Sequence, residues 1–281
     1  MSIQIITDSA SDITDHIRED ITVLPMTITF GETEYQDGVN LSHHEFYERL
    51  IESGELPTTS QIPPYDFETA IQKALAEEKE VIIITLSSKL SGTWQSACIA
   101  ASEYPQKVFV VDSENVTVGE RALVEYAVRL KDEGMDAPSI VAKLEKEKKN
   151  IHLIALLDTL EYLKKGGRVS KAAAFAGGVL SIKPVVAIED GEVNILGKAR
   201  GSKQGNNFLV QKIKESGVDF DKPYFLGYTG LTDALLQKYI EDSKELWQDH
   251  IQSLPVSTVG GTIGTHAGPG AIAVAFFAQN P

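Results

Sequence analysis

The strongest constraint on the fold is the segment at residues 81–86, VIIITL, which is apolar and largely β-branched. Such residues favour strands, and a strand without alternating polar residues is typical of a parallel sheet covered on both faces. Residues 3–7 and 108–111 have the same character, and helix-compatible stretches follow at about 94–102 and 119–133. Strands that alternate with helices predict an α/β domain built on a parallel sheet with right-handed crossovers.

The second half of the chain has a different pattern. Short strand-like segments there alternate with helical stretches at 205–216 and 232–246, and Asp190-Gly191 is a typical hairpin turn between two of the strands. The strand-like segments are 151–157, 184–188, 192–198, 224–228 and 257–262. Hairpins mixed with helices predict a mixed or antiparallel sheet with helices packed on it.

The length of the chain supports two domains, because 281 residues are about twice the size of an ordinary domain. The highly charged segment at 138–149 separates the two patterns. We therefore expect an N-terminal α/β domain at 1–150 and a C-terminal α/β domain at 151–281. Polar groups at the strand ends of the first sheet would gather at one edge, where ligands of open α/β sheets bind.

The composition excludes several classes of protein. With 26 Lys and Arg against 40 Asp and Glu, the formal net charge is −14, which argues against binding to nucleic acid or anionic lipid. The single cysteine, Cys98, excludes an internal disulfide and a multi-thiolate metal site, and it fits a reducing compartment. Residues 1–7 show no signal-peptide pattern, so we expect a cytoplasmic protein. The longest weakly polar runs, 172–182 and 267–278, are too short for a membrane span, so no stable membrane insertion is expected.

Four polar segments, which we expect to be loops, carry residues suited to binding or catalysis. The first, at 57–61, contains Thr59 and Ser60 ahead of a helix that begins near Asp66. Hydroxyls at such a place can bind an anion together with free backbone N–H groups, or they can simply cap the helix.

The second polar segment, at residues 87–93, contains Ser91, Gly92 and Thr93 after the buried strand. A strand-to-helix turn with a glycine that permits close backbone approach can hold a nucleophilic serine, an anion or an ordinary N-cap. The sequence contains neither G-x-S-x-G nor S-x-x-K, the two commonest contexts of a nucleophilic serine. Acyl transfer on Ser91 therefore has no motif to support it.

The third segment is Lys164-Lys165-Gly166-Gly167-Arg168. Lysines in a last helical turn followed by glycine are what a helix C-terminus prefers, which leaves Arg168 as a candidate anion clamp. The fourth segment, residues 264–270, places His266 among glycines next to an apolar terminal stretch. A structural histidine and a ligand-binding one are equally open at this position.

No cofactor and no metal site are expected. The glycines at 260–270 do not form G-x-G-x-x-G, and G-x-x-x-x-G-K-[ST] is absent, so nucleotide binding lacks its usual motifs. The adjacent pair His43-His44 cannot comfortably face one metal on a strand, and H-E-x-x-H is absent. Residues 8–12, DSASD, match no calcium loop and fit a cap instead.

In their order along the chain, these segments resemble the DegV family of fatty-acid-binding proteins, which occurs mainly in Gram-positive bacteria and their relatives. The matching segments span nearly the whole chain and are Thr7-Asp8-Ser9-Ala10-Ser11-Asp12, Thr59-Ser60-Gln61, Ser87-Ser88-Lys89-Leu90-Ser91-Gly92-Thr93, Val111-Asp112-Ser113, Gly166-Gly167-Arg168 and Gly264-Thr265-His266-Ala267-Gly268-Pro269-Gly270. The sequence departs from the family pattern at Ile62, where the family usually has proline; here the prolines follow at 63 and 64.

The resemblance implies two α/β domains with one long-chain fatty acid buried between them. It implies that Thr59, Ser91 and His266 contact the carboxyl group. The supporting residues would be Ser60, Gly92, Thr93 and Arg168. Burial of about fourteen methylenes of a sixteen-carbon tail, at ~0.8 kcal/mol each, would supply roughly 11 kcal/mol before ordering costs. A buried carboxylate would lose several kcal/mol of this without hydrogen-bond partners, so polar groups must meet it.

The resemblance also implies a partner and a role. Relatives present the acid to a separate ATP-dependent fatty acid kinase, whose acyl-phosphate product enters phospholipid synthesis, so the protein itself would be a carrier and not an enzyme. Lys198 and Arg200 are candidates for the kinase contact. Residues 172–180 and 276–277 are candidates for the lining of the tail, with ordinary core as the simpler interpretation.

Two other functions stay open. The chain could be a serine-dependent small-molecule hydrolase or acyltransferase, with Ser91 as nucleophile and His266 as base. It could also be an interaction module, which ranks last because it leaves the hydroxyl-rich segments without a use.

Overall fold

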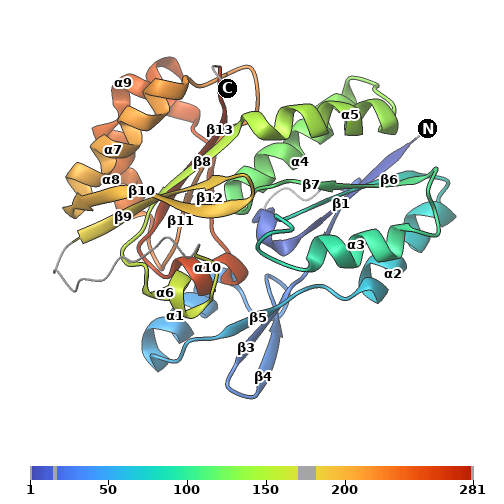
Figure 1. The fold of residues 1–281 in the computed structure, drawn as a ribbon, viewed down its shortest axis with the longest axis horizontal. Helices are drawn as coiled ribbons and strands as arrows, with labels where there is room; N and C mark the ends of the chain where they lie inside the picture. The colour runs from blue at the N-terminus through green and yellow to red at the C-terminus, as the bar shows by residue number, and fades with distance from the viewer. Residues whose placement is uncertain (1, 15–17, 170–181, 280–281) are drawn as a thin grey trace.

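The computed structural model of the protein describes residues 2–14, 18–169 and 182–279. A four-stranded parallel sheet fills the N-terminal region, in the order β2–β1–β6–β7 (Figure 1). Its strands are β1 (Ile3–Asp8), β2 (Ile21–Leu24), β6 (Glu80–Thr85) and β7 (Val108–Asp112). One face is covered by α2 (Pro64–Ala76) and α3 (Thr93–Ala101), the other by α4 (Thr117–Asp132) and α5 (Ala137–Glu147). The predicted parallel sheet is therefore confirmed, and coverage of both faces explains why β6 is buried from its second residue onward.

A six-stranded mixed sheet forms the C-terminal region, in the order β10–β9–β8–β13–β11–β12 (Figure 1). Its strands are β8 (Ile151–Leu156), β9 (Ile182–Glu189), β10 (Glu192–Arg200), β11 (Phe225–Tyr228), β12 (Val256–Thr258) and β13 (Ile272–Phe277). β11 and β12 run parallel, and the other neighbours run antiparallel. The helices α7 (Gly201–Ser216) and α8 (Ala234–Asp242) pack on one face. The prediction of a mixed sheet with a hairpin at Asp190-Gly191 is confirmed.

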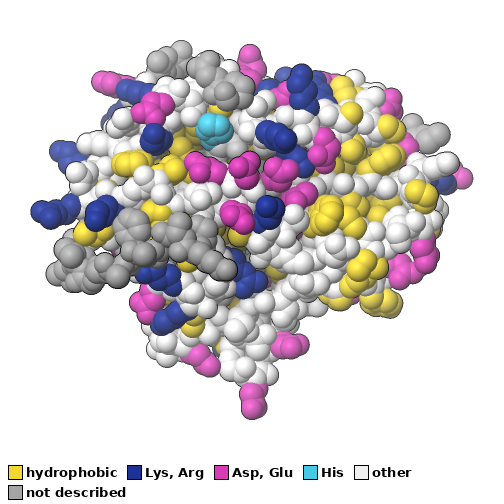
Figure 2. Space-filling model, viewed as in Figure 1, with side chains coloured by type: hydrophobic (Ala, Val, Ile, Leu, Met, Phe, Trp, Pro, Cys, Tyr) yellow, Lys and Arg dark blue, Asp and Glu magenta, His cyan; other side chains and the backbone are white. Residues whose placement is uncertain are grey.

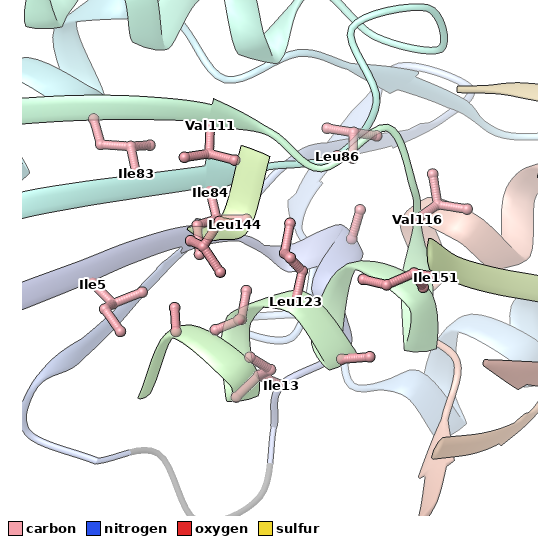
Figure 3. Packing of buried hydrophobic residues seen from close by; sticks show 14 of the residues in the cluster. Ile5, Ile13, Ile83, Ile84, Leu86, Val111, Val116, Leu123, Leu144 and Ile151 are labelled. Atoms are coloured by element: carbon pink, nitrogen blue, oxygen red, sulfur yellow. The ribbon is translucent and has the colours of Figure 1, made fainter. Parts of the chain in front are cut away.

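The helix α4 lies between the two sheets. It contacts β1 and β6 on one side and β8, β11 and β13 on the other, and twelve of its sixteen residues are buried. Figure 3 shows its Leu123 among Ile84 of β6, Val111 of β7 and Leu144 of α5. A helix that is buried on nearly all sides belongs to the interior of the molecule. The division of the chain near residue 150 stays a prediction.

A third, three-stranded antiparallel sheet was not foreseen. It has the order β4–β3–β5, and its strands are β3 (Thr27–Phe30), β4 (Thr33–Gln36) and β5 (Thr58–Ser60). The helix α1 (His43–Ser53) packs beside it, with Phe46 and Ile28 in one small apolar cluster. The polar segment predicted as a loop at 57–61 is therefore partly a strand, because Thr59 pairs with Ile28.

The glycine-rich segment near the C-terminus also differs from the expectation. The strand expected at 257–262 ends at Thr258, and the loop expected at 264–270 begins inside the helix α10 (Gly261–Ala267). Glycine disfavours helices locally, but the buried carboxylates of Asp12 and Asp37 accept hydrogen bonds from the backbone at 260–262 and stabilise the first turn. Such long-range bonds leave no local trace in the sequence.

The remaining elements are short. They are α6 (Glu161–Lys165), α9 (Lys244–Trp247) and the 3-10 turns η1 (Ser9–Ser11), η2 (Lys148–Asn150) and η3 (Gln248–Ser253). The helix expected at 232–246 is thus divided into α8 and α9 at Ser243, whose Oγ donates to the carbonyl of Tyr239. On the face in Figure 2, acidic and basic side chains are interspersed. Among the described residues, no helix is both long enough and apolar enough to cross a membrane.

Candidate functional site

A cavity lies between the parallel sheet and the mixed sheet. Its volume is about 920 Å³, part of which is open to solvent. The strand β8 supplies one wall through alternation: Leu153 and Ala155 face the cavity, whereas Ile154 and Leu156 belong to the core beneath α7. This alternation is the period of a strand with two different apolar faces. The cavity is therefore part of the fold itself and not an accident of a loop.

Small residues make room over the centre of the mixed sheet. Ala155 of β8 pairs with Ala273 of β13, which in turn pairs with Gly227 of β11. All three line the cavity, and Val186 and Ile188 of β9 extend the same apolar wall. A row of small residues between larger ones leaves a trough that an extended apolar chain can fill.

One end of the cavity is polar, and its centre is the pair Thr59 and His266. The Oγ1 of Thr59 lies 3.2 Å from the Nε2 of His266, although the two residues are 207 positions apart. Thr59 is placed by β5 and His266 by α10, and both line the cavity. Two of the three residues predicted to contact a carboxyl group therefore form one hydrogen-bonded unit.

The ring of His266 is neutral at physiological pH. Burial lowers its pKa to about 4, and the positive charge of Arg168 contributes in the same direction. Its Nδ1 is buried and has no hydrogen-bond partner within the described residues. An N–H left unpaired costs more than an unpaired acceptor, so the arrangement favours the hydrogen on Nε2. Thr59 then accepts from His266 and keeps its own hydroxyl hydrogen for a ligand.

Ser91 belongs to a separate turn that faces the same cavity. Its Oγ accepts from the backbone N–H of Thr93 at 3.3 Å and lies 3.0 Å from Thr93 Oγ1. The turn is fixed by buried Ser87, whose carbonyl accepts from the N–H of Ser91 and whose Oγ donates to the carbonyl of Gly191 at 2.7 Å. In the described part of the chain, no hydrogen bond joins Ser91 to His266.

Arg168 ties two of these segments together. Its Nε donates to the carbonyl of Leu90 at 3.2 Å and its Nη1 to the carbonyl of Gly166 at 2.7 Å, so it links the turn before Ser91 with the end of α6. It also lines the cavity. A guanidinium at the polar end of a mostly apolar cavity can balance the charge of one anionic group.

Comparison with known proteins gives a consistent result. Residues 2–279 match the family model described as "Uncharacterised protein, DegV family". A DegV domain-containing protein of Caldanaerobacter subterraneus subsp. tengcongensis is 35% identical over 279 residues, covering 98% of each chain. The chain belongs to the DegV family.

Solved DegV structures share the fold over their whole length. A DegV family protein from Thermus thermophilus, described by its fatty acid binding, has a TM-score of 0.88 at 29% identity, with 99% of this chain and 100% of that chain covered. DegV of Bacillus subtilis, described as a fatty acid binding protein, has a TM-score of 0.82 at 28% identity, with 99% and 100% covered. These proteins are described as binders of fatty acids.

The predicted site residues of this DegV protein fall into two groups. Thr59, Ser91, Arg168 and His266 line the cavity. Ser60, Gly92 and Thr93 are not among its lining residues: Ser60 is exposed on β5, and Thr93 is buried behind Ser91. Gly92 lies against Gln61, and a Cβ built on it would be 2.0 Å from Gln61 Oε1.

Among the described residues, five polar residues of the lining were not singled out from the sequence: Gln61, Thr117, Tyr228, Thr229 and Thr262. Gln61 lines the cavity and donates through Nε2 to Ser96 Oγ at 3.1 Å. Thr262 lines it one helical turn before His266, and its buried Oγ1 has no partner within the described residues. The i, i+4 spacing of Thr262 and His266 places both on one face of α10. This spacing could have revealed Thr262 only if the segment had been predicted as a helix.

Phe276 and Phe277, two candidates for the lining of the tail, are not among the described residues that line the cavity. Phe276 belongs to the core beneath α7, and Phe277 packs on Tyr126 with ring centroids 5.2 Å apart. The candidate lining at 172–180 lies outside the described residues. Lys198 and Arg200 are exposed on β10, and their role in docking stays a prediction. Among the described residues, no group of three or more His, Cys, Asp or Glu side chains could hold a metal ion.

Proposed function

We propose that this protein binds one long-chain fatty acid in the cavity between its sheets, as a carrier without catalytic turnover. The carboxylate lies at the polar end, where Thr59 and Ser91 donate hydrogen bonds and Arg168 balances the charge. The tail lies in the trough over Ala155 and Ala273. The single observation that supports this most strongly is the hydroxyl–imidazole pair at one end of a mostly apolar cavity.

The state of His266 fits an anionic ligand. A neutral ring that donates to Thr59 leaves the hydroxyl hydrogen of Thr59 for the carboxylate, and Arg168 supplies the compensating positive charge nearby. A buried carboxylate is tolerated only when it is paired and hydrogen-bonded. Tail burial then supplies most of the affinity, at ~0.8 kcal/mol for each methylene.

Denaturing mass spectrometry of protein purified from a bacterial host tests the proposal. We expect a co-purified fatty acid, and we expect delipidated protein to bind added palmitate or oleate. Ser91→Ala together with His266→Ala should weaken binding while circular dichroism shows an intact fold. Protein that stays empty and does not bind either acid would contradict the proposed function, and an unchanged affinity in the double variant would contradict the head-group assignment.

We further propose that the bound acid is presented to a separate fatty acid kinase in the cytoplasm and that its acyl phosphate is used in phospholipid synthesis. This proposal rests on the resemblance to the DegV family. Purified protein, kinase and ATP should give acyl phosphate together and not singly. Lys198→Glu and Arg200→Glu should lower this rate without changing acid affinity.

The hydrolase alternative has less support from the geometry, because His266 pairs with Thr59. A fluorophosphonate probe distinguishes the two functions. Labelling of Ser91 that depends on His266 would favour a nucleophilic serine. The carrier function predicts no labelling at Ser91.

A further inference from the structure

We infer that Asp37 is a positioning residue for the polar end of the cavity: by capping α10 it holds His266 at hydrogen-bond distance from Thr59. The inference rests on the proposed function. Asp37 is 3% exposed and is not among the residues that line the cavity, so it acts through α10 and not through contact with a ligand.

The carboxylate of Asp37 is bound almost entirely by the start of α10. Its Oδ1 accepts from the backbone N–H of Gly261 at 3.0 Å, and its Oδ2 accepts from the N–H of Thr262 at 3.0 Å. Ser9 Oγ adds a third bond to Oδ2 at 3.3 Å. Asp12 completes the set, since its Oδ1 accepts from the N–H of Gly260 at 2.7 Å. Two buried carboxyl groups thus satisfy three successive backbone donors at the start of one helix.

The helix α10 needs this external cap. It has seven residues, two of them glycine, and its N-cap is Gly260, which has no side chain to accept a bond. Short helices are costly to nucleate, and glycine lowers their stability further. Asp37 supplies from another segment the acceptor that Ser, Thr, Asp or Asn supplies in ordinary helices. The position of His266, five residues after Gly261, therefore depends on this tertiary cap.

The hairpin of β3 and β4, which leads to Asp37, also positions Thr59. Ile28 of β3 pairs with Thr59 and lies so close to Gly261 that a Cβ on the glycine would be 2.5 Å from Ile28 Cδ1. One turn later a Cβ on Gly264 would be 2.6 Å from the hydroxyl of Tyr47. The small sheet, α1 and α10 therefore pack without spare room. Asp37, directly after β4, holds α10 against this packed unit through its two hydrogen bonds.

The test measures binding of two ligands to the full-length protein at pH 7.5: palmitate and 1-hexadecanol, which has the same chain and no carboxylate. Asp37→Asn keeps the shape of the side chain but turns one acceptor into an amide that faces a backbone donor. We expect it to weaken palmitate binding about tenfold and hexadecanol binding at most about twofold. The control is Glu120→Gln, a buried carboxyl that bonds Thr7, and both affinities should stay unchanged.

A double-mutant cycle shows whether Asp37 acts through His266. In a His266→Ala background, Asp37→Asn should cause no further loss of palmitate affinity. Additive losses, or an equal weakening of both ligands, would overturn the inference. Wild-type protein that binds neither ligand would contradict the proposed function itself. Wild-type binding that Asp37→Asn leaves intact would contradict only the role of Asp37.

If Asp37→Asn does not fold, Ser9→Ala provides the second variant. It removes one bond to Asp37 Oδ2 and the acceptor of the Met26 N–H, and it leaves the two contacts with α10 in place. We expect a smaller loss of palmitate affinity, about twofold to threefold, with hexadecanol affinity unchanged. Equal affinities of Ser9→Ala and wild type for palmitate would overturn the inference.

Discussion

Gly166 lies directly against the ring of His266, so closely that a Cβ on the glycine would be 2.2 Å from Nδ1. The end of α6 therefore limits the space beside Nδ1 of the imidazole. Because the φ of Gly166 is −74°, glycine is required there for space and not for backbone conformation.

Gly166→Ala should consequently displace His266 from Thr59. We expect palmitate affinity to fall about tenfold, because one hydrogen bond to the head-group unit is lost. Isothermal titration measures this, and the histidine ring resonances in NMR report the displacement. If the alanine variant binds palmitate like wild type and leaves those resonances unshifted, the close approach does not position His266.

The lowered pKa of His266 predicts a dependence of stability on pH. The ordinary pKa is 6.5 and burial lowers it to about 4, so the unfolded chain binds the proton first on acidification. The stabilisation is fully present above pH 6.5 and is lost as the pH falls toward 4. Between pH 7 and 4, wild type should lose about 2–3 kcal/mol more than His266→Gln, in which an amide can still donate to Thr59. Urea titrations at several pH values measure the difference, and parallel curves would contradict the assignment.

The raised pKa of Glu120 predicts the opposite dependence of stability on pH. Burial raises its pKa well above the usual 4.5, and the nearby Asp8 raises it further. The protonated group stabilises the fold at low pH, and this contribution is lost as the pH rises above 4.5 toward the folded pKa. Glu120→Gln should therefore be close to wild type at pH 4 and more stable by about 1–3 kcal/mol at pH 9.

A surface control separates this effect from a general charge effect. Glu133 is exposed and pairs with Arg129, so Glu133→Gln should change stability by less than about 0.5 kcal/mol at both pH values. Chemical denaturation of both variants provides the comparison. An equal difference between Glu120→Gln and wild type at pH 4 and pH 9 would show that the carboxyl does not titrate as expected.

Ala273 and Ala275 form a matched pair on one face of β13. Ala273 lines the cavity, whereas Ala275 is fully buried in the core. Ala273→Leu should leave the melting temperature nearly unchanged and shift preference toward acids about three carbons shorter, because the added carbons occupy tail space. Ala275→Leu should cost about 1–3 kcal/mol by overpacking. Competition binding with a series of acids and thermal melts test the pair. Equal destabilisation by both changes would mean that the trough beside Ala273 does not exist in solution.

Much of the architecture could be predicted from local pattern. The apolar run at 81–86 identified a strand buried on both faces, and Asp190-Gly191 identified the hairpin between β9 and β10. The position of polar residues after strands indicated where a ligand could bind. These features depend on residues close in sequence, which is why periodicity and turn chemistry were sufficient.

The features that escaped prediction depend on distant residues. The helix α10 contains residues that favour loops, and its stability comes from Asp12 and Asp37, more than two hundred positions away. The strand β5 exists because it pairs with β3. Gln61 and Thr262 became visible as cavity residues only when these elements were placed. Thr59 and His266 could be singled out as residue types, but not as partners.

The position of α4 makes the stability of each large sheet depend on the other. Because α4 contacts strands of both large sheets, neither sheet has a complete hydrophobic core without it. A cut after residue 150 would leave one apolar face of the mixed sheet exposed to solvent. The C-terminal fragment should therefore aggregate. Heating should likewise melt both halves in a single cooperative step. Any movement that admits a ligand must then involve the outer segments of the molecule, while α4 stays in place.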